Sequence, residues 1–286
     1  MKVFVQGMGL MGASLALRLK ELGHEVAGSV RSEGSRKLLK SRGLPEVILA
    51  GEFAPEHLIG TDLLVLGLNI SDCLPAIDAA MAIPELRESL VVIDMCSTKQ
   101  QICDHVAQHH PQARFVGTHP MAGKETQGPG AADALLFENC TVYITPAVSN
   151  SDRLIQDTAM VAEFWRSVGA RTCTIGALDH DRTMAYVSHG LHLAACLIAR
   201  MSGEAAGSPD TPSPAAGSYR DMTRIAMSSG AMWQDIVMSN RENVVHWLKQ
   251  LSSETNLLAE VLESGKADIV SLFSDAATAR ARVMRT

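Results

Sequence analysis

The sequence predicts an α/β N-terminal part, built on a doubly wound parallel sheet, followed by an all-α C-terminal part. Short apolar runs typical of buried parallel strands alternate with helical stretches through residues 1–175. The first apolar run leads directly into a glycine-rich turn and an amphipathic helix. From residue 177 onward no strand pattern occurs, and helical periodicity dominates. We therefore expect two domains, residues 1–175 and residues 176–286.

The first strand, residues 2–6, ends in a G-x-G-x-x-G motif, and a helix is predicted over residues 13–22. In this order the glycines allow a tight turn and bring a pyrophosphate close to a helix N-terminus. The motif predicts a Rossmann-type domain. Its expected cofactor-binding residues are Gly7, Gly9, Leu10, Met11 and Gly12.

The second strand, residues 25–30, carries the signal for the type of cofactor. NAD enzymes usually end this strand with an acidic residue that binds the ribose hydroxyls. Here Val30 is followed by Arg31, Ser32 and Arg36, which can bind a 2′-phosphate. This predicts NADP rather than NAD, with a preference of about 30- to 150-fold in kcat/KM. The alternative is a solvated basic loop.

Further apolar runs are expected to continue the parallel alternation, with helical stretches between them. The strands are expected at residues 62–68, 90–94, 115–117, 141–144 and 171–174, and the helices at 73–82, 99–108 and 152–168. Parallel sheets bind ligands at the carboxyl ends of their strands. Ser97 and His119 both follow such ends, so the two side chains could face one crevice.

His119 is the titratable group of the loop Thr-His-Pro-Met-Ala-Gly. Pro120 biases His119 toward an extended backbone, and Gly123 permits a tight turn or a close approach to a ligand. An isolated loop histidine is more often structural than catalytic. Its position in a nucleotide-binding domain makes His119 a candidate general base.

The C-terminal part combines apolar helices with several polar groups. Helices are expected over residues 179–202, 219–228, 232–250 and 255–285, with a flexible connection over 203–217. We expect this part to bury its apolar surface in a homodimer. His189 and Arg224 are candidate site residues, although a core histidine and a solvated arginine are the simpler interpretations.

Composition narrows the class of protein. The net charge is −6, and no Lys/Arg run indicates a nucleic-acid or membrane surface. The six cysteines form no C-x-x-C pair, which argues against a zinc knuckle and for reduced thiols. Residues 2–6 form a strand pattern rather than a signal peptide, and no apolar run is long enough to span a bilayer. These features predict a cytoplasmic protein with a small-molecule substrate and no metal.

Taken together, the motifs resemble the prephenate/arogenate dehydrogenase family of tyrosine biosynthesis over nearly the whole chain. The matching stretches are the Gly7–Gly12 turn and residues 94–99, 119–123, 136–139, 180–181, 188–192 and 219–226. The resemblance implies a Rossmann domain followed by a dimerising helical domain. It also implies oxidative decarboxylation of a cyclohexadienol, arogenate or prephenate, to tyrosine or 4-hydroxyphenylpyruvate, with hydride transfer to the nicotinamide.

The same resemblance implies roles for individual residues. His119 would accept the proton of the ring hydroxyl, and Ser97 would orient His119. His189 and Arg224 would bind the carboxylate end of the substrate, while Glu125 would line the entrance. Asp221 or Glu125 could favour the α-ammonium of arogenate, but each could equally pair with an arginine. The choice of substrate and feedback by tyrosine therefore stay open.

Two departures from the family pattern and two competing functions remain. Gly190 interrupts the usual Ser-His-Leu-Pro-His pattern, which leaves the placement of His192 open, and Asn69 replaces a proline that often follows the strand over residues 62–68. A β-hydroxyacid or imine-reducing dehydrogenase would carry a lysine or a different polar set on the first long C-terminal helix, and residues 179–202 contain no lysine. A non-catalytic NADPH-binding sensor would bind cofactor without turnover.

Overall fold

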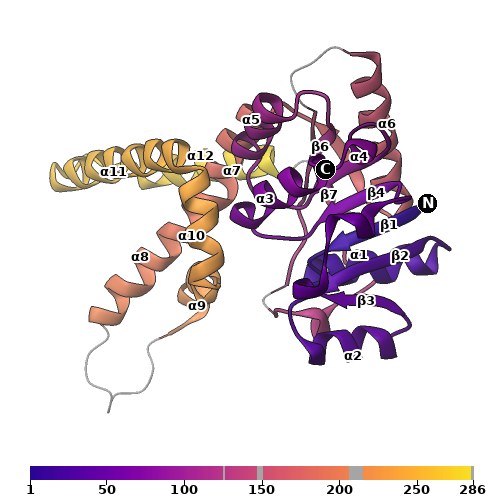
Figure 1. Cartoon of the computed structure of the whole chain (residues 1–286). Coiled ribbons are helices and arrows are strands. Elements are labelled where there is room, and N and C mark those ends of the chain that lie inside the picture. Colours follow the sequence, from indigo (N-terminus) through magenta and orange to yellow (C-terminus); the bar gives the residue numbers. More distant parts are fainter. Residues whose placement is uncertain (125, 147–150, 206–214, 285–286) are drawn as a thin grey trace. The chain divides into compact units, whose positions relative to one another are not determined.

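The computed structural model describes residues 1–124, 126–146, 151–205 and 215–284 (Figure 1). The chain forms two compact units, Met1–Arg241 and Glu242–Thr286. The predicted division between residues 175 and 176 lies inside the first unit, where the last strand gives way to helices. In the part of the chain that the structure describes, no helix has both the length and the apolarity to cross a bilayer.

The first unit contains one eight-stranded sheet in the order β3-β2-β1-β4-β5-β6-β7-β8. Its strands are β1 Lys2–Gln6, β2 Glu25–Val30, β3 Glu46–Leu49, β4 Leu63–Leu66, β5 Val91–Asp94, β6 Arg114–Pro120, β7 Thr141–Pro146 and β8 Arg171–Thr174. The strand order reverses beside β1, so a crevice is expected at the carboxyl ends of β1 and β4. The predicted fold class is confirmed.

One detail of the sheet differs from the prediction, because β7 runs antiparallel to β6. A parallel pairing would need a crossover, usually an α-helix. Between β6 and β7 the described residues contain only a 3-10 turn, Pro129–Ala131. Without a crossover helix, β7 returns along β6 in the opposite direction.

Helices cover both faces of the sheet, and alternate strand residues point to the two sides. Val3 and Val5 of β1 face the layer of α1 (Leu10–Glu21), α2 (Glu33–Ser41) and α6 (Asp152–Ser167). Phe4 faces the layer of α3 (Ile70–Met81), α4 (Pro84–Ser89) and α5 (Gln100–His109). This two-sided burial explains why the central strands are continuous apolar runs.

Three short elements went unrecognised in the sequence, namely α2, β3 and α4. The stretch after β2, for which a solvated basic loop was the alternative to a phosphate site, is the start of α2. Ser32 is the N-cap of this helix, with its Oγ accepting a hydrogen bond from the Ser35 amide at 3.2 Å. Polar residues after a strand therefore begin a helix here instead of forming a loop.

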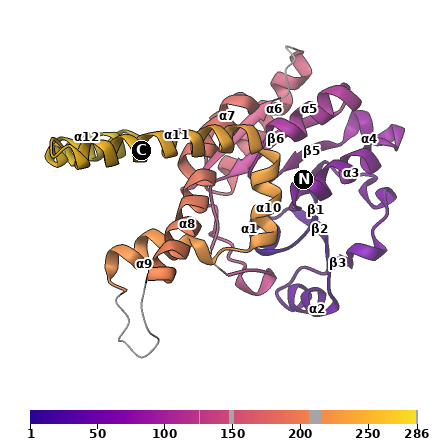
Figure 2. The ribbon, with the colours of Figure 1, turned by 90° about the vertical axis from the view of Figure 1, so that its left-hand side faces the viewer.

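The helical part is confirmed in type but divided differently. It comprises α7 Ala177–Met184, a π-helical turn Ala185–His189, α8 Gly190–Ala205, α9 Gly217–Thr223, a 3-10 turn Arg224–Met227, α10 Gly230–Ser239, α11 Arg241–Glu263 and α12 Ile269–Val283. Figure 2 shows α8, α9 and α10 as one group outside the sheet. Residues 206–214 of the predicted connection lie outside the described residues.

Two predicted C-terminal helices have the wrong bounds. The helix expected over residues 232–250 is broken at Asn240, between α10 and α11. The helix expected over 255–285 is broken at Gly265, whose φ of 68° is the left-handed conformation that ends many helices. Both helix ends lie within stretches where the helical sequence pattern continues, so the pattern did not predict them.

Candidate active site

The glycine-rich turn has the geometry that its motif predicts. Gly7 has φ 92°, and a Cβ there would lie 2.5 Å from the Gly67 oxygen. A Cβ on Gly12 would lie 2.3 Å from the Gly7 oxygen, whereas a Cβ on Gly9 would meet nothing within 4 Å. Gly9 is the N-cap of α1, and no side chain caps this end. The first and third glycines therefore serve packing, and the helix N-terminus is open to a pyrophosphate.

The residues predicted to bind a 2′-phosphate lie together at the end of β2 and the start of α2, but they are not equally available to a phosphate. Arg36 forms ion pairs with Glu33 and with Glu52, the latter at 3.0 Å. Arg31 reaches Asp72 only at 3.5 Å, and its side chain is 78% exposed. A phosphate would compete with two carboxylates for Arg36, so Arg31 is the more available cation.

A buried ion pair braces the carboxyl ends of β5 and β6 beside His119. The Lys99 ammonium pairs with Asp94 and donates to the Thr118 oxygen at 2.8 Å. The Asp94 carboxylate also accepts the amides of Cys96 at 2.8 Å and Thr118 at 3.2 Å. Burial alone would lower the pKa of Lys99, but Asp94 outweighs it and the pKa is raised. The strand end that carries His119 is thus rigidly held.

His119 is oriented by a partner from the helical part. Its Nδ1 lies 2.8 Å from His180 Nε2, and His180 Nδ1 lies 2.7 Å from Asp181 Oδ1. The Asp181 carboxylate also accepts the amides of Lys99 at 2.8 Å and Gln100 at 2.9 Å, at the start of α5. The three side chains are 8%, 0% and 1% exposed. They form a buried chain from carboxylate to imidazole to imidazole.

The carboxylate decides how protons are arranged along this chain. Asp181 can only accept, so His180 Nδ1 carries a proton and donates it. A neutral His180 then accepts at Nε2, which makes His119 the donor through Nδ1–H. His119 Nε2 is left with a lone pair, and the structure gives it no hydrogen-bond partner among the described residues. Burial, helped by His180 and Lys99, lowers the pKa of His119 well below its usual value, so the ring stays neutral.

His189 joins the same buried network through Asn240. The Asn240 amide nitrogen donates to the Asp181 backbone oxygen at 2.7 Å and to His189 Nδ1 at 3.0 Å. His189 is 1% exposed, and its Nε2 has no partner in the described part of the chain. Burial lowers the pKa of His189 to about 4. The ring therefore presents a neutral Nε2–H donor near His119.

Trp233, on α10, supplies a second hydrogen-bond donor close to His189. The Trp233 ring stacks on His192 at 3.7 Å between centroids and lies 6.0 Å from the His189 ring. Its indole Nε1 is buried and unpartnered in the described residues. Burial and then the charge of Arg224 lower the pKa of His192, which places Arg224 nearby. Trp233 is a candidate that sequence analysis missed, because an isolated tryptophan in an apolar helix gives no signal.

The remaining predicted residues are less closely joined. Ser97 follows β5 and is half-buried, but no described hydrogen bond connects it to His119. Asp221 is exposed on α9, one turn before Arg224. Glu125 lies outside the described residues. His180 holds His119 Nδ1 in this structure, and the role expected for Ser97 stays a prediction.

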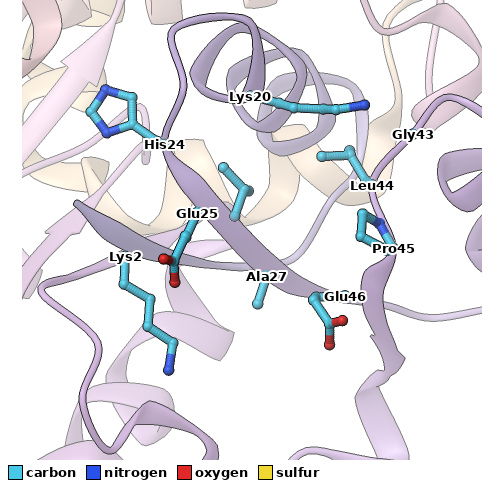
Figure 3. A pocket seen from close by; sticks show the side chains of 10 residues that line it. Lys2, Lys20, His24, Glu25, Ala27, Gly43, Leu44, Pro45 and Glu46 are labelled. Atoms are coloured by element: carbon cyan, nitrogen blue, oxygen red, sulfur yellow. The ribbon is translucent and has the colours of Figure 1, made fainter.

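A separate pocket lies at the opposite end of the strands. Figure 3 shows it among Lys2, Glu25 and Glu46, which begin β1, β2 and β3. Its volume is about 320 Å³, and none of the predicted site residues lines it. Because parallel sheets bind their ligands at the carboxyl ends of the strands, this cavity is not the candidate active site.

Comparisons with known proteins identify the family to which the chain belongs. The family profile for the prephenate dehydrogenase nucleotide-binding domain matches residues 15–174, and the profile for the prephenate dehydrogenase dimerization domain matches residues 177–274. The chain is 29% identical over 270 residues to a cyclohexadienyl dehydrogenase from Zymomonas mobilis, covering 93% of this chain and 90% of that protein. It is also 29% identical over 267 residues to a prephenate dehydrogenase from Lactococcus lactis, covering 90% and 70%.

A solved structure has the same fold. Prephenate dehydrogenase from Aquifex aeolicus, in complex with hydroxyphenyl propionate and NAD⁺, superposes with a TM-score of 0.82 at 24% identity, covering 99% of this chain and 98% of that one. The two profiles together span most of the sequence, in the order found here. The chain belongs to the prephenate dehydrogenase family.

Proposed function

We propose that this dehydrogenase oxidatively decarboxylates a cyclohexadienol, prephenate or arogenate, to 4-hydroxyphenylpyruvate or tyrosine, with NADP as hydride acceptor. The observation that carries the proposal is the arrangement of His119. Its Nδ1 is held by His180 at 2.8 Å, while its Nε2 has no described partner. A buried neutral imidazole near the carboxyl end of β6, in a nucleotide-binding sheet, is what proton removal from a ring hydroxyl requires.

His119 Nε2 is the base in this mechanism. It takes the hydroxyl proton while hydride leaves C4 of the ring. The bond from C1 to the ring carboxylate then breaks, and its electron pair completes the aromatic ring as carbon dioxide departs. The bound nicotinamide would supply the hydride acceptor.

The positive charge that forms on His119 is stabilised through its partners. As Nε2 gains a proton, the Nδ1–H donates more strongly to His180, which is held in turn by Asp181. The Asp181 carboxylate is itself fixed by two amides of α5. The network therefore orients the base without taking its proton.

The substrate's polar groups have matching donors. His189 Nε2–H is buried without a described partner, which costs about 1–3 kcal/mol unless a ligand accepts from it. Arg224 would bind the side-chain carboxylate of a dianionic substrate, because a guanidinium is permanently charged and planar. Asp221 and Glu125 stay proposed contacts for the α-ammonium of arogenate.

The proposal that NADP is the cofactor rests on the glycine-rich turn and on the residues at the end of β2. The geometry of Gly7, Gly9 and Gly12 suits a pyrophosphate, and Val30 offers no carboxylate to repel a 2′-phosphate. Arg31 and Ser32 are the proposed phosphate ligands, with Arg36 shared with Glu33 and Glu52. The Aquifex aeolicus relative was solved with NAD⁺.

Assembly into a homodimer is part of the proposal. The second unit exposes large apolar side chains on both of its helices. They include Leu257, Leu262, Val270 and Phe273, which are 56%, 51%, 82% and 70% exposed. Apolar surface of this extent favours burial against a second copy, and the matching profile describes a dimerization domain.

The test is a two-by-two assay of purified chain, with prephenate and arogenate each offered with NAD and with NADP. Turnover is followed as reduced nicotinamide, and the phenolic product is identified by its absorbance. We expect turnover in at least one NADP combination. Cofactor binding with no turnover of either substrate would contradict the proposal and favour a sensor.

A further inference from the structure

A cluster of metal-ligating side chains lies at the far end of α5 from the candidate active site. His105 Nε2 and His110 Nε2 lie 2.7 Å and 2.6 Å from the same oxygen, Asp78 Oδ1. Asp78 belongs to α3, His105 to α5, and His110 caps α5. The Gln100 amide at the start of α5 contacts Asp181, so His105 and His110 lie five and ten residues further along, or roughly 7.5 and 15 Å at 1.5 Å per residue.

The three ligand atoms converge as they would around a single ion. All lie within 4.8 Å of one another. Ligands at about 2.0–2.2 Å from one tetrahedral ion lie roughly 3.3–3.6 Å apart, so an ion would replace the two hydrogen bonds and separate the ring nitrogens slightly from Asp78 Oδ1. The side chains of His105 and His110 are 18% and 21% exposed, and that of Asp78 is 48% exposed. Solvent can therefore reach the cluster and supply the remaining ligands.

The protonation states also suit a metal. A carboxylate can only accept, so both rings donate N–H to Asp78 when no ion is bound. Moving each ring proton to Nδ1 leaves two neutral nitrogens and a carboxylate facing one point.

We propose that Asp78, His105 and His110 bind a divalent transition-metal ion of the Zn²⁺ class, joining α3 to α5. Two imidazoles and one carboxylate suit Zn²⁺, Co²⁺ and Ni²⁺, whereas Mg²⁺ prefers a shell of oxygens. The ion would act as a structural clamp, because its ligands come from two neighbouring helices. The alternative is that the cluster binds no ion and consists of two ordinary histidine–aspartate hydrogen bonds.

The ligand set makes the test specific. Full-length protein stripped with EDTA is titrated with Zn²⁺ by calorimetry, and with Co²⁺ by visible absorption. We expect one ion per chain in the parent, at least tenfold weaker binding in His105→Gln and in His110→Gln, and no binding of Mg²⁺. His109→Gln is the matched control, since its ring stacks on His105 at 4.5 Å but its Nδ1 donates to a backbone oxygen.

A second readout is thermal unfolding. Added Zn²⁺ should raise Tm in the parent and in His109→Gln, because an ion that binds only the folded state stabilises it. The increase should vanish in His105→Gln and His110→Gln. Binding that survives either of these substitutions, or no Zn²⁺ binding tighter than about 100 µM in the parent, would overturn the proposal. Asp78→Ala repeats the test if a histidine variant fails to fold.

Discussion

The fold holds two predicted groups of residues differently. They are His119 and His189, expected as base and substrate ligand, and Arg31 and Arg36, expected to bind a 2′-phosphate. His119 and His189 are at most 8% exposed, and each has one nitrogen bonded and one without a described partner. The Arg31 side chain is 78% exposed, and Arg36 is paired with Glu33 and Glu52. An unpartnered buried atom is costly and therefore informative, whereas exposed charges exchange partners with water and salt at little cost.

The largest effect is expected at His119. His119→Asn can still hydrogen-bond His180 but offers no base, so kcat should fall by about 10²–10⁴ with cofactor affinity unchanged. Steady-state kinetics and a cofactor titration measure the two quantities. His109→Gln, on the surface of α5, serves as the control and should keep its kcat. A near-parental kcat in His119→Asn would show that the base lies elsewhere.

Acid should destabilise the fold through the same network. The folded-state pKa of His189 is about 4, below its ordinary 6.5, so the unfolded chain binds more protons between these values. Stability is therefore full above pH 6.5 and falls toward pH 4, by about 3 kcal/mol for this group. His119 and His180, whose pKa values are also lowered, add to the loss.

Denaturant unfolding at pH 7.5, 6 and 5 tests this acid sensitivity. His189→Gln should flatten the dependence, because a glutamine takes up no proton. An equal slope in the parent and in His189→Gln would mean that His189 is not held neutral in the folded protein.

Arg224 should affect binding more than chemistry. Arg224→Ala removes a charge-assisted contact to the substrate carboxylate, so KM should rise by about 10- to 100-fold with a smaller change in kcat. Arg220→Ala, an exposed arginine on α9, is the matched control. If both variants raise KM equally, the effect is one of general charge and not of a specific contact.

The smallest effect is expected at Arg31 and Arg36, the arginines predicted to bind the 2′-phosphate of NADP. Because Arg36 is already paired, the NADP preference should be nearer tenfold than the 30- to 150-fold expected from sequence. Arg31→Ala should lower kcat/KM for NADP more than Arg36→Ala does. Val30→Asp combined with Arg31→Ala should reverse the preference. A larger loss in Arg36→Ala would show that its carboxylate partners release it to the phosphate.

Local sequence was sufficient for much of the first unit. The β1 and β2 bounds and the glycine turn agree with prediction, because strand apolarity and the demand for glycine at φ 92° are properties of the chain itself. The direction of β7 was not predicted, because the apolar run over residues 141–144 carries no signal for strand direction. Strand β7 runs antiparallel to β6 because no crossover helix precedes it among the described residues.

In the candidate site, too, some features could be predicted from the sequence and others depended on the tertiary structure. The sequence predicted that His119 follows a strand over residues 115–117, at the carboxyl edge of a nucleotide-binding sheet, whereas β6 extends to Pro120 and contains His119. Only the tertiary structure decided which nitrogen of His119 is free, because His180 lies 61 residues away in the chain and reaches it only when the helices pack on the sheet. Likewise Glu52, 16 residues from Arg36, engages that arginine only in the folded chain. Hydrogen bonds and ion pairs depend on distances in space, which a linear pattern does not contain.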